Sequence, residues 1–192
     1  LRLQTIEYNS LGGDEPYSIY LMQMAPGDIV EAQFSDNNPP LYELILHYWI
    51  SVFGTDEWAV RLPSVLFSSG TLLILFLLAW RHSSLTVAST VGLLFILSNY
   101  QQEYAQHARA YALLGMNSTA SMFFFAELLR ALRIHPVDRS TWRIPRKWRF
   151  ATGGLLLSNL LLLYTHYMGL LLVVAQLLVI FSSIRRIRMA WK

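Results

Sequence analysis

Residues 104–111 read Tyr-Ala-Gln-His-Ala-Arg-Ala-Tyr and lie between two long apolar runs, residues 85–104 and 111–132. A membrane-spanning helix needs about 20 mostly apolar residues, and both runs are long enough. A charged side chain at the end of a membrane bundle is costly and usually faces a polar site instead of lipid. Arg109 is therefore the first candidate for a functional residue, and the two runs are candidate membrane spans.

The composition of the whole chain also indicates a membrane protein. Of the 192 residues, 54% are hydrophobic and only 14% are charged, and the mean hydropathy is +0.38. A soluble domain of this length rarely carries so much apolar side chain. No cysteine is present, which excludes disulfides and thiolate metal sites. We therefore predict an all-α integral membrane protein.

Five apolar runs predict five membrane spans, at residues 58–80, 85–104, 111–132, 150–164 and 168–184. Residues 58–192 are thus expected to form a multi-spanning helix bundle. Two further helices are expected in residues 1–57, one starting at Asp14-Glu15-Pro16 and one covering residues 41–53. The second would be about 20 Å long, which is too short to span, so both are expected to lie at the membrane surface as outer juxtamembrane helices.

Charge is distributed unevenly along the chain, and this distribution orients the predicted spans. Nine acidic residues precede position 58, where Arg2 is the only basic residue. Basic residues gather after the first span, between the third and fourth, and after the fifth. Cytoplasmic loops carry the excess of lysine and arginine, so residues 1–57, 104–111 and 164–167 are expected on the periplasmic side of the inner membrane. The basic groups are expected to attract membrane lipids, and no nucleic-acid partner is expected.

Five motifs occur along the chain in an order that resembles a known family. They are Asp14-Glu15, Pro39-Pro40-Leu41-Tyr42, Trp58-Ala59-Val60-Arg61-Leu62-Pro63, residues 104–111, and Tyr164-Thr165-His166-Tyr167. This order is similar to that of the polyprenyl-phosphate-dependent glycosyltransferases of the GT-C fold, such as the protein O-mannosyltransferases and the aminoarabinose transferases, and it resembles glycosyltransferase family 39. The chain departs from the family at His107, where an acid is usual, and at Asn38, where a basic residue often stands. The family's first helix and its C-terminal portion are expected to lie outside this sequence.

The resemblance implies inverting transfer of a hexose or pentose from a polyprenyl-phosphate-sugar lipid to an acceptor glycan, lipid or protein at the outer face. Asp14 is expected to act as the general base, with Glu15 beside it in the catalytic pair. From the spacing alone, Asp14 could equally be only the N-cap of a helix. The residues expected to bind the lipid phosphate and its sugar are Arg109, Tyr104, Gln106, Tyr111, His166 and Tyr167.

Plainer interpretations exist for these residues and for the whole chain. Arg109 could snorkel to lipid headgroups, and a lone histidine such as His166 in a turn is more often structural. No cofactor is expected, although a divalent metal held by Asp14, Glu15 or Asp36 with a histidine is an alternative. The chain could instead be a shortened, non-catalytic subunit of a larger membrane complex, with other membrane subunits as partners. A transporter is disfavoured because the polar residues gather at one face and not near the midplane.

Overall fold

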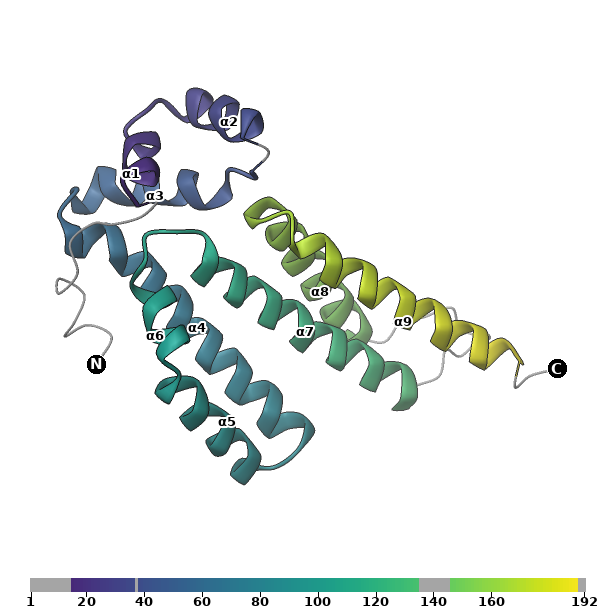
Figure 1. The fold of residues 1–192 in the computed structure, drawn as a ribbon. Coiled ribbons are helices and arrows are strands. Elements are labelled where there is room, and N and C mark those ends of the chain that lie inside the picture. Colours follow the sequence, from purple (N-terminus) through teal and green to yellow (C-terminus); the bar gives the residue numbers. More distant parts are fainter. Residues whose placement is uncertain (1–14, 37, 135–145, 190–192) are drawn as a thin grey trace.

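The computed structural model describes residues 15–36, 38–134 and 146–189 of the chain (Figure 1). Every regular element in these residues is an α-helix, which confirms the predicted all-helical class. The helices are α1 (Glu15–Met22), α2 (Pro26–Ser35), α3 (Leu41–Phe53), α4 (Glu57–His82), α5 (Leu85–Leu97), α6 (Asn99–Gln106), α7 (Tyr111–Ile134), α8 (Arg146–Thr165) and α9 (Gly169–Met189).

Helices α4, α5, α7, α8 and α9 form a bundle, and α1–α3 lie together at one end of it (Figure 1). Helix α4 packs against α5 and α7, α7 packs against α8, and α9 contacts both α7 and α8. The short helix α6 lies against α4, and α3 contacts both α4 and α8. The α6–α7 connection and the α8–α9 turn therefore lie at the same end of the bundle as α1–α3 (Figure 1).

Two helices of the bundle are long and apolar enough to cross a membrane, Glu57–His82 and Tyr111–Leu132. Only 28% of the apolar window of each helix is buried inside the structure, although the core helix of a soluble protein is mostly buried. Large apolar side chains are also exposed along α5, α8 and α9, including Leu93, Leu94, Leu97, Leu156, Leu157, Leu160, Leu170, Leu171, Leu177 and Leu178. An exposed apolar surface of this extent is typical of a protein that contacts lipid or another apolar partner.

The predicted apolar runs are all helical, but the second run is not one continuous helix. Residues 85–104 are divided into α5 and α6 at Ser98, whose backbone is extended with φ −70° and ψ 114°. The Ser98 hydroxyl accepts a hydrogen bond from the N–H of Gln101 at 3.4 Å, so it caps the start of α6. The apolar helix that remains, α5, is shorter than a full span.

The N-terminal segment contains one helix more than the sequence predicts. Helices α1 and α3 begin near the predicted starts, but α2 was not expected. Its start has Pro26 in the first turn and Asp28 close behind it, and both residues favour a helix N-terminus. The helix is only ten residues long and starts with Pro26-Gly27, a pair that is also typical of a turn.

Helices α3 and α4 are joined by specific polar contacts as well as by packing. Pro63 lies inside α4 and has no N–H, so the carbonyl of Ala59, one turn earlier, lacks its usual helical donor. The indole Nε1–H of Trp49 in α3 donates to this carbonyl at 2.9 Å. At Ser64, the residue that follows Pro63, the side-chain hydroxyl is hydrogen-bonded to the hydroxyl of Tyr42 at 3.1 Å in a buried contact. These contacts fix α3 across the start of α4.

Two apolar clusters form the described core of the bundle. The first joins α1, α3, α4 and the start of α7, and consists of Met22, Tyr42, Leu46, Val60, Ala108 and Leu113. The second joins α7 to α8, and consists of Phe125, Leu128, Ala151 and Leu155. The first cluster anchors the α6–α7 connection because Ala108 is fully buried in it.

A closed ring of hydrogen bonds links α7, α8 and α9 inside the bundle. Ser121 Oγ donates to Asn159 Oδ1 at 2.5 Å, and Asn159 Nδ2 donates to Gln176 Oε1 at 2.9 Å. Gln176 Nε2 completes the ring by donating to Ser121 Oγ at 2.7 Å. Nearer the α8–α9 turn, Asn117 Nδ2 donates to Thr165 Oγ1 at 2.9 Å. Polar side chains in an apolar bundle are stabilising when they are paired across helices, as they are here.

Candidate functional site

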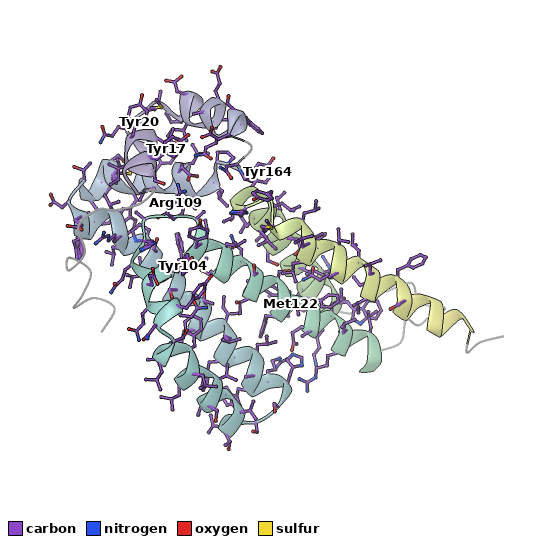
Figure 2. All side chains as sticks on the ribbon, viewed as in Figure 1. Tyr17, Tyr20, Tyr104, Arg109, Met122 and Tyr164 are labelled. Carbon is purple, nitrogen blue, oxygen red and sulfur yellow. The ribbon has the colours of Figure 1, made fainter. Side chains whose placement is uncertain are left out.

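A cavity of about 310 Å³ lies where α2 and α3 meet the start of α7 and the end of α8. We call it the Arg109 cavity. Its lining residues are Tyr17, Gln33, Asp36, Asn38, Pro39, Glu43, Arg109, Ala110, Tyr111, Thr165 and His166. Figure 2 shows Arg109 between the α1–α3 group and the start of α7, with Tyr17 on the α1 side. The cavity therefore combines side chains from segments that are far apart in the sequence.

Arg109 is held in the tight connection between α6 and α7. Its backbone N–H donates to the carbonyl of His107 at 2.8 Å, and the neighbouring Ala108 is fully buried. The guanidinium Nη1 donates to the hydroxyl of Ser18, a fully buried residue of α1, at 3.3 Å. The half-buried arginine is thus fixed both at its backbone and at its charged end, which a snorkelling side chain would not require.

Glu43 brings a buried carboxyl group to the same cavity. It lies in α3 on the face that also buries Tyr42 and Leu46, and only 6% of Glu43 is exposed. Burial raises the pKa of the Glu43 carboxyl above its ordinary value, because a charged form loses its hydration there. A backbone hydrogen bond and the positive charge of Arg109 oppose this rise in pKa. The cavity therefore contains a carboxyl group that binds its proton more tightly than an exposed glutamate.

A second carboxylate lies at the more exposed side of the cavity. Asp36 follows α2 directly, and the hydroxyl of Tyr17 in α1 donates a hydrogen bond to its Oδ2. This hydrogen bond to Asp36 is the main reason why the pKa of Tyr17 is raised. The pair holds the Asp36 carboxylate in place between α1 and the segment that leads into α3.

His166 contributes an imidazole from the turn after α8. The backbone N–H of Met168 donates to His166 Nδ1 at 3.2 Å, so in the neutral ring the proton belongs on Nε2. Desolvation first, and then the charge of Arg109, lowers the pKa of His166 below its ordinary 6.5. At neutral pH the ring is therefore uncharged and can donate a hydrogen bond from Nε2.

A row of aromatic rings runs along this end of the bundle. The centroids of Tyr104 and Tyr111 lie 4.9 Å apart in an edge-to-face arrangement, and those of Tyr111 and His166 lie 6.5 Å apart. His166 and Tyr167 continue the row at 4.5 Å. Tyr111 also lines a second cavity of about 360 Å³ between α4, α6 and α7, to which Tyr104 belongs. The row thus connects the Arg109 cavity to the interior of the bundle.

The predicted site residues are brought together only in part. Arg109, Tyr111 and His166 line the Arg109 cavity, as expected for one binding site. The remaining predicted binding residues, Tyr104, Gln106 and Tyr167, are not part of its lining. The predicted catalytic pair is not placed. Asp14 lies outside the described residues, and Glu15 begins α1 with a side chain that is also outside them.

Asp36 and Glu43 both line the cavity, although the sequence did not predict that they share one site and named Asp36 only as an alternative metal ligand. Glu43 did carry a signal, since helical spacing puts it on the same face as Leu46 in an otherwise apolar helix. A carboxylate on a buried face is unusual and is often functional. Asp36 carried no comparable signal because its closeness to Tyr17 depends on the fold of α2.

Within residues 15–36, 38–134 and 146–189, no three histidine, aspartate or glutamate side chains are close enough together to hold a metal ion. The alternative of a divalent metal held by Asp14, Glu15 or Asp36 with a histidine involves two side chains outside this part of the chain, those of Asp14 and Glu15, so it stays a prediction. Comparisons of the chain with family models, with curated proteins and with solved structures find no match.

Proposed function

We propose that this chain is the membrane-embedded part of a GT-C-like glycosyltransferase that uses a polyprenyl-phosphate-sugar donor. The observation that carries the proposal is the Arg109 cavity. It gathers a guanidinium, a neutral imidazole and two carboxyl groups at one end of an apolar helix bundle. This set provides cationic and neutral donors for a phosphate together with bases for an acceptor.

The distribution of charge in the bundle supports a membrane topology with the cavity at the outer face. Basic side chains of α4, α7 and α8 gather around one site at the far end of the bundle, namely Arg81, Arg130, Arg146 and Lys147. About 29 Å of helix separate Tyr111 from Arg130 along α7, which is close to the thickness of a hydrocarbon core. Because excess lysine and arginine mark the cytoplasmic side, the Arg109 cavity would face the periplasm of a cell with an inner membrane.

In the proposed complex, the donor phosphate lies against Arg109 and His166. The planar guanidinium can form two parallel hydrogen bonds with phosphate oxygens, and the Nε2–H of His166 can donate a third. Negative charge grows on the phosphate as the bond to the sugar breaks. A fixed cation and donor therefore stabilise the leaving group more than the bound substrate.

The transfer also needs a base for the acceptor. In the proposed step the acceptor oxygen or nitrogen bonds to the sugar C1, while the C1–O bond to phosphate breaks and its electron pair leaves with the phosphate. The acceptor proton passes to a carboxylate. We assign this role to Asp14 from the motif order. Asp36 is the described carboxylate that could share it, and the buried Glu43 is less suited because its raised pKa keeps it protonated more readily.

Binding of a polyprenyl phosphate to the purified protein in detergent tests the phosphate site. Arg109→Gln is expected to weaken binding about tenfold or more, since a charge-assisted hydrogen bond contributes about 1.5–3 kcal/mol. Arg149→Gln is the matched control, because it removes the same charge from an exposed residue of α8 outside the cavity. If wild type and Arg109→Gln bind polyprenyl phosphate with equal affinity, Arg109 does not bind the phosphate.

Turnover distinguishes an enzyme from a non-catalytic subunit. Sugar release from a polyprenyl-phosphate-sugar donor, measured in the protein together with its native membrane partners, should be lost in Asp14→Asn while the protein stays folded. Full activity of that variant would remove Asp14 from the mechanism. Absence of both turnover and polyprenyl-phosphate binding in the wild type would favour the alternative of a structural subunit.

A further inference from the structure

A third cavity, of about 640 Å³, lies at the opposite end of the bundle between the ends of α4 and α7 and the start of α8. We call it the basic-end cavity. Its lining residues are Arg81, Phe123, Glu127, Arg130, Ala131, Arg146, Lys147, Phe150 and Ala151. Its volume is within the range of small-molecule binding sites. None of its residues belongs to the Arg109 cavity.

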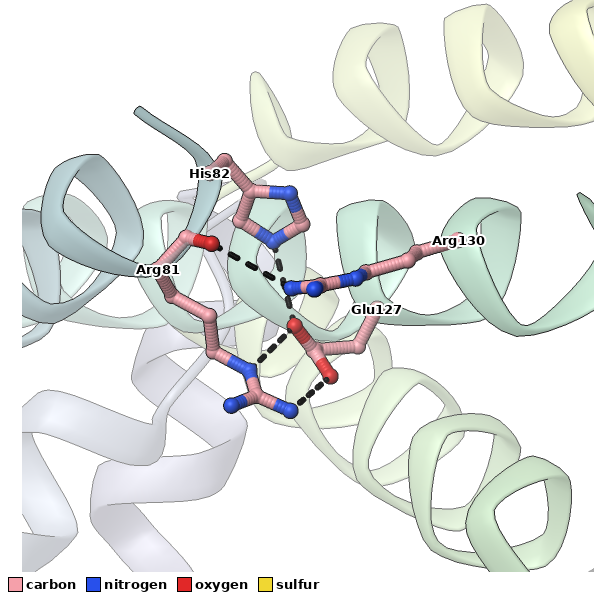
Figure 3. A network of polar contacts seen from close by, with 4 residues as sticks. All are labelled: Arg81, His82, Glu127 and Arg130. Carbon is pink, nitrogen blue, oxygen red and sulfur yellow. Dashed lines mark hydrogen bonds and ion pairs between the residues drawn. The ribbon is translucent and has the colours of Figure 1, made fainter. Parts of the chain in front are cut away.

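The carboxylate of this cavity is already occupied by protein donors (Figure 3). Arg81 donates to both oxygens of Glu127, from Nε at 2.6 Å and from Nη2 at 3.0 Å. His82 Nε2 lies 3.1 Å from the same carboxylate. Glu127 is thereby fixed to the end of α4 and can neutralise no more than one of the surrounding cations.

Arg130 is oriented by the same network, in which it shares the single carboxylate of Glu127 with Arg81. Its Nη1 donates to the backbone carbonyl of Arg81 at 3.2 Å, which holds the guanidinium beside the network (Figure 3). Arg146 and Lys147 join it from the exposed first turn of α8. Four cationic side chains therefore face one carboxylate among the described lining residues, a surplus of three positive charges.

The interior of the cavity is apolar. Phe123 and Ala131 come from α7, and Phe150 and Ala151 come from α8. Phe150 lines the cavity but is 68% exposed, so much of its ring is open to a ligand. The centroids of the Phe150 and Phe124 rings lie 5.6 Å apart in an edge-to-face arrangement. A ligand for this cavity must therefore bring an anionic group for the rim and hydrocarbon for the interior.

We propose that the basic-end cavity binds an anionic phospholipid. Its phosphate lies among Arg130, Arg146 and Lys147, and an acyl chain lies against Phe123 and Phe150. This occupant fits the position of the cavity, because the ends of two helices long enough to span a membrane lie at headgroup depth, where basic pockets attract anionic lipids. The inference rests on α4 and α7 spanning a membrane and does not depend on the glycosyltransferase proposal.

Native mass spectrometry of the full chain, exchanged from detergent into phosphatidylglycerol or phosphatidylcholine, tests the site. We expect phosphatidylglycerol to be retained at least fivefold better than phosphatidylcholine. Arg146→Gln should abolish that preference, whereas Arg149→Gln, one turn further along α8 and outside the lining, should keep it. Phe150→Ala should weaken retention of phosphatidylglycerol as well, because it removes apolar contact area.

Two results would overturn the proposal. An equal loss in Arg146→Gln and Arg149→Gln would mean that lipid retention reflects general surface charge. Full competition by inorganic phosphate would mean that the rim binds free anions without a contribution from hydrocarbon. Circular dichroism of each variant checks that the helices are intact, and Arg130→Gln provides a second variant if Arg146→Gln does not fold.

Discussion

The indole of Trp49 donates its hydrogen bond to the carbonyl of Ala59, the acceptor that Pro63 cannot serve. The contact explains how a proline is tolerated inside α4. It also explains how α3, which carries Glu43, is held across the start of α4, a helix long and apolar enough to cross a membrane.

Trp49→Phe should lower the free energy of unfolding by about 1 kcal/mol, because it removes the donor and leaves the Ala59 carbonyl unpaired. In the background of Pro63→Ala, which restores a backbone N–H to α4, the same substitution should cost less. Thermal unfolding of the four proteins in detergent measures the coupling. Identical costs of Trp49→Phe in both backgrounds would show that the hydrogen bond does not compensate for the proline.

The raised pKa of the buried Glu43 carboxyl leads us to expect that the stability of the protein depends on pH. Burial raises the pKa of Glu43 in the folded protein, so the folded state binds this proton more tightly than the unfolded state. The resulting gain in the free energy of unfolding is complete below the ordinary pKa of 4.5 and is lost as pH rises through the raised pKa. The wild-type unfolding temperature should therefore fall over this pH range. Glu43→Gln has no group that ionises at this position, so its unfolding temperature should fall less. Glu31→Gln, at an exposed position of α2, is the control and should follow the wild-type curve.

His166 predicts that lipid-phosphate binding strengthens in mild acid. Its pKa is lowered by desolvation and by Arg109, so the ring gains a positive charge only below its ordinary 6.5, and a bound phosphate favours that charge. His166→Gln retains a donor but does not titrate, which separates the ring from the titration of the phosphate itself. If wild type and His166→Gln show the same change in affinity with pH, the imidazole does not contact the phosphate.

The hydrogen-bonded ring of Ser121, Asn159 and Gln176 predicts that α9 depends on polar contacts for its position. Gln176→Leu removes one hydrogen bond from Ser121 and one from Asn159, which keep only the bond to each other, and it should destabilise the bundle by about 0.6–1.7 kcal/mol, as measured for such bonds in membranes. Leu178→Ala, at an exposed position of the same helix, should have a smaller effect. Proteolysis between α8 and α9 or thermal unfolding in detergent can detect the difference.

Local patterns predicted the helices well because apolar runs of spanning length are a strong signal. They failed at Ser98, where a capping hydroxyl divides one apolar run into two helices. They also missed α2, which is only ten residues long and begins with a proline and a glycine that are equally typical of a turn.

The candidate site was less predictable than the helices. Arg109, Tyr111 and His166 were found because a charge or a polar turn interrupts apolar sequence at each position. Asp36 and Tyr17 could not be paired from the sequence, since their contact depends on how α1 and α2 fold back. Glu43 was visible as an anomaly of α3, but its neighbours in the cavity come from elements far along the chain.

The central claim is that a lipid phosphate binds between Arg109 and His166. An experimental structure of the protein with a polyprenyl phosphate tests it most directly. We expect the phosphate to lie within hydrogen-bonding distance of the Arg109 guanidinium and of His166 Nε2. A phosphate bound elsewhere, for instance among Arg130, Arg146 and Lys147, with the Arg109 cavity left without lipid, would contradict it.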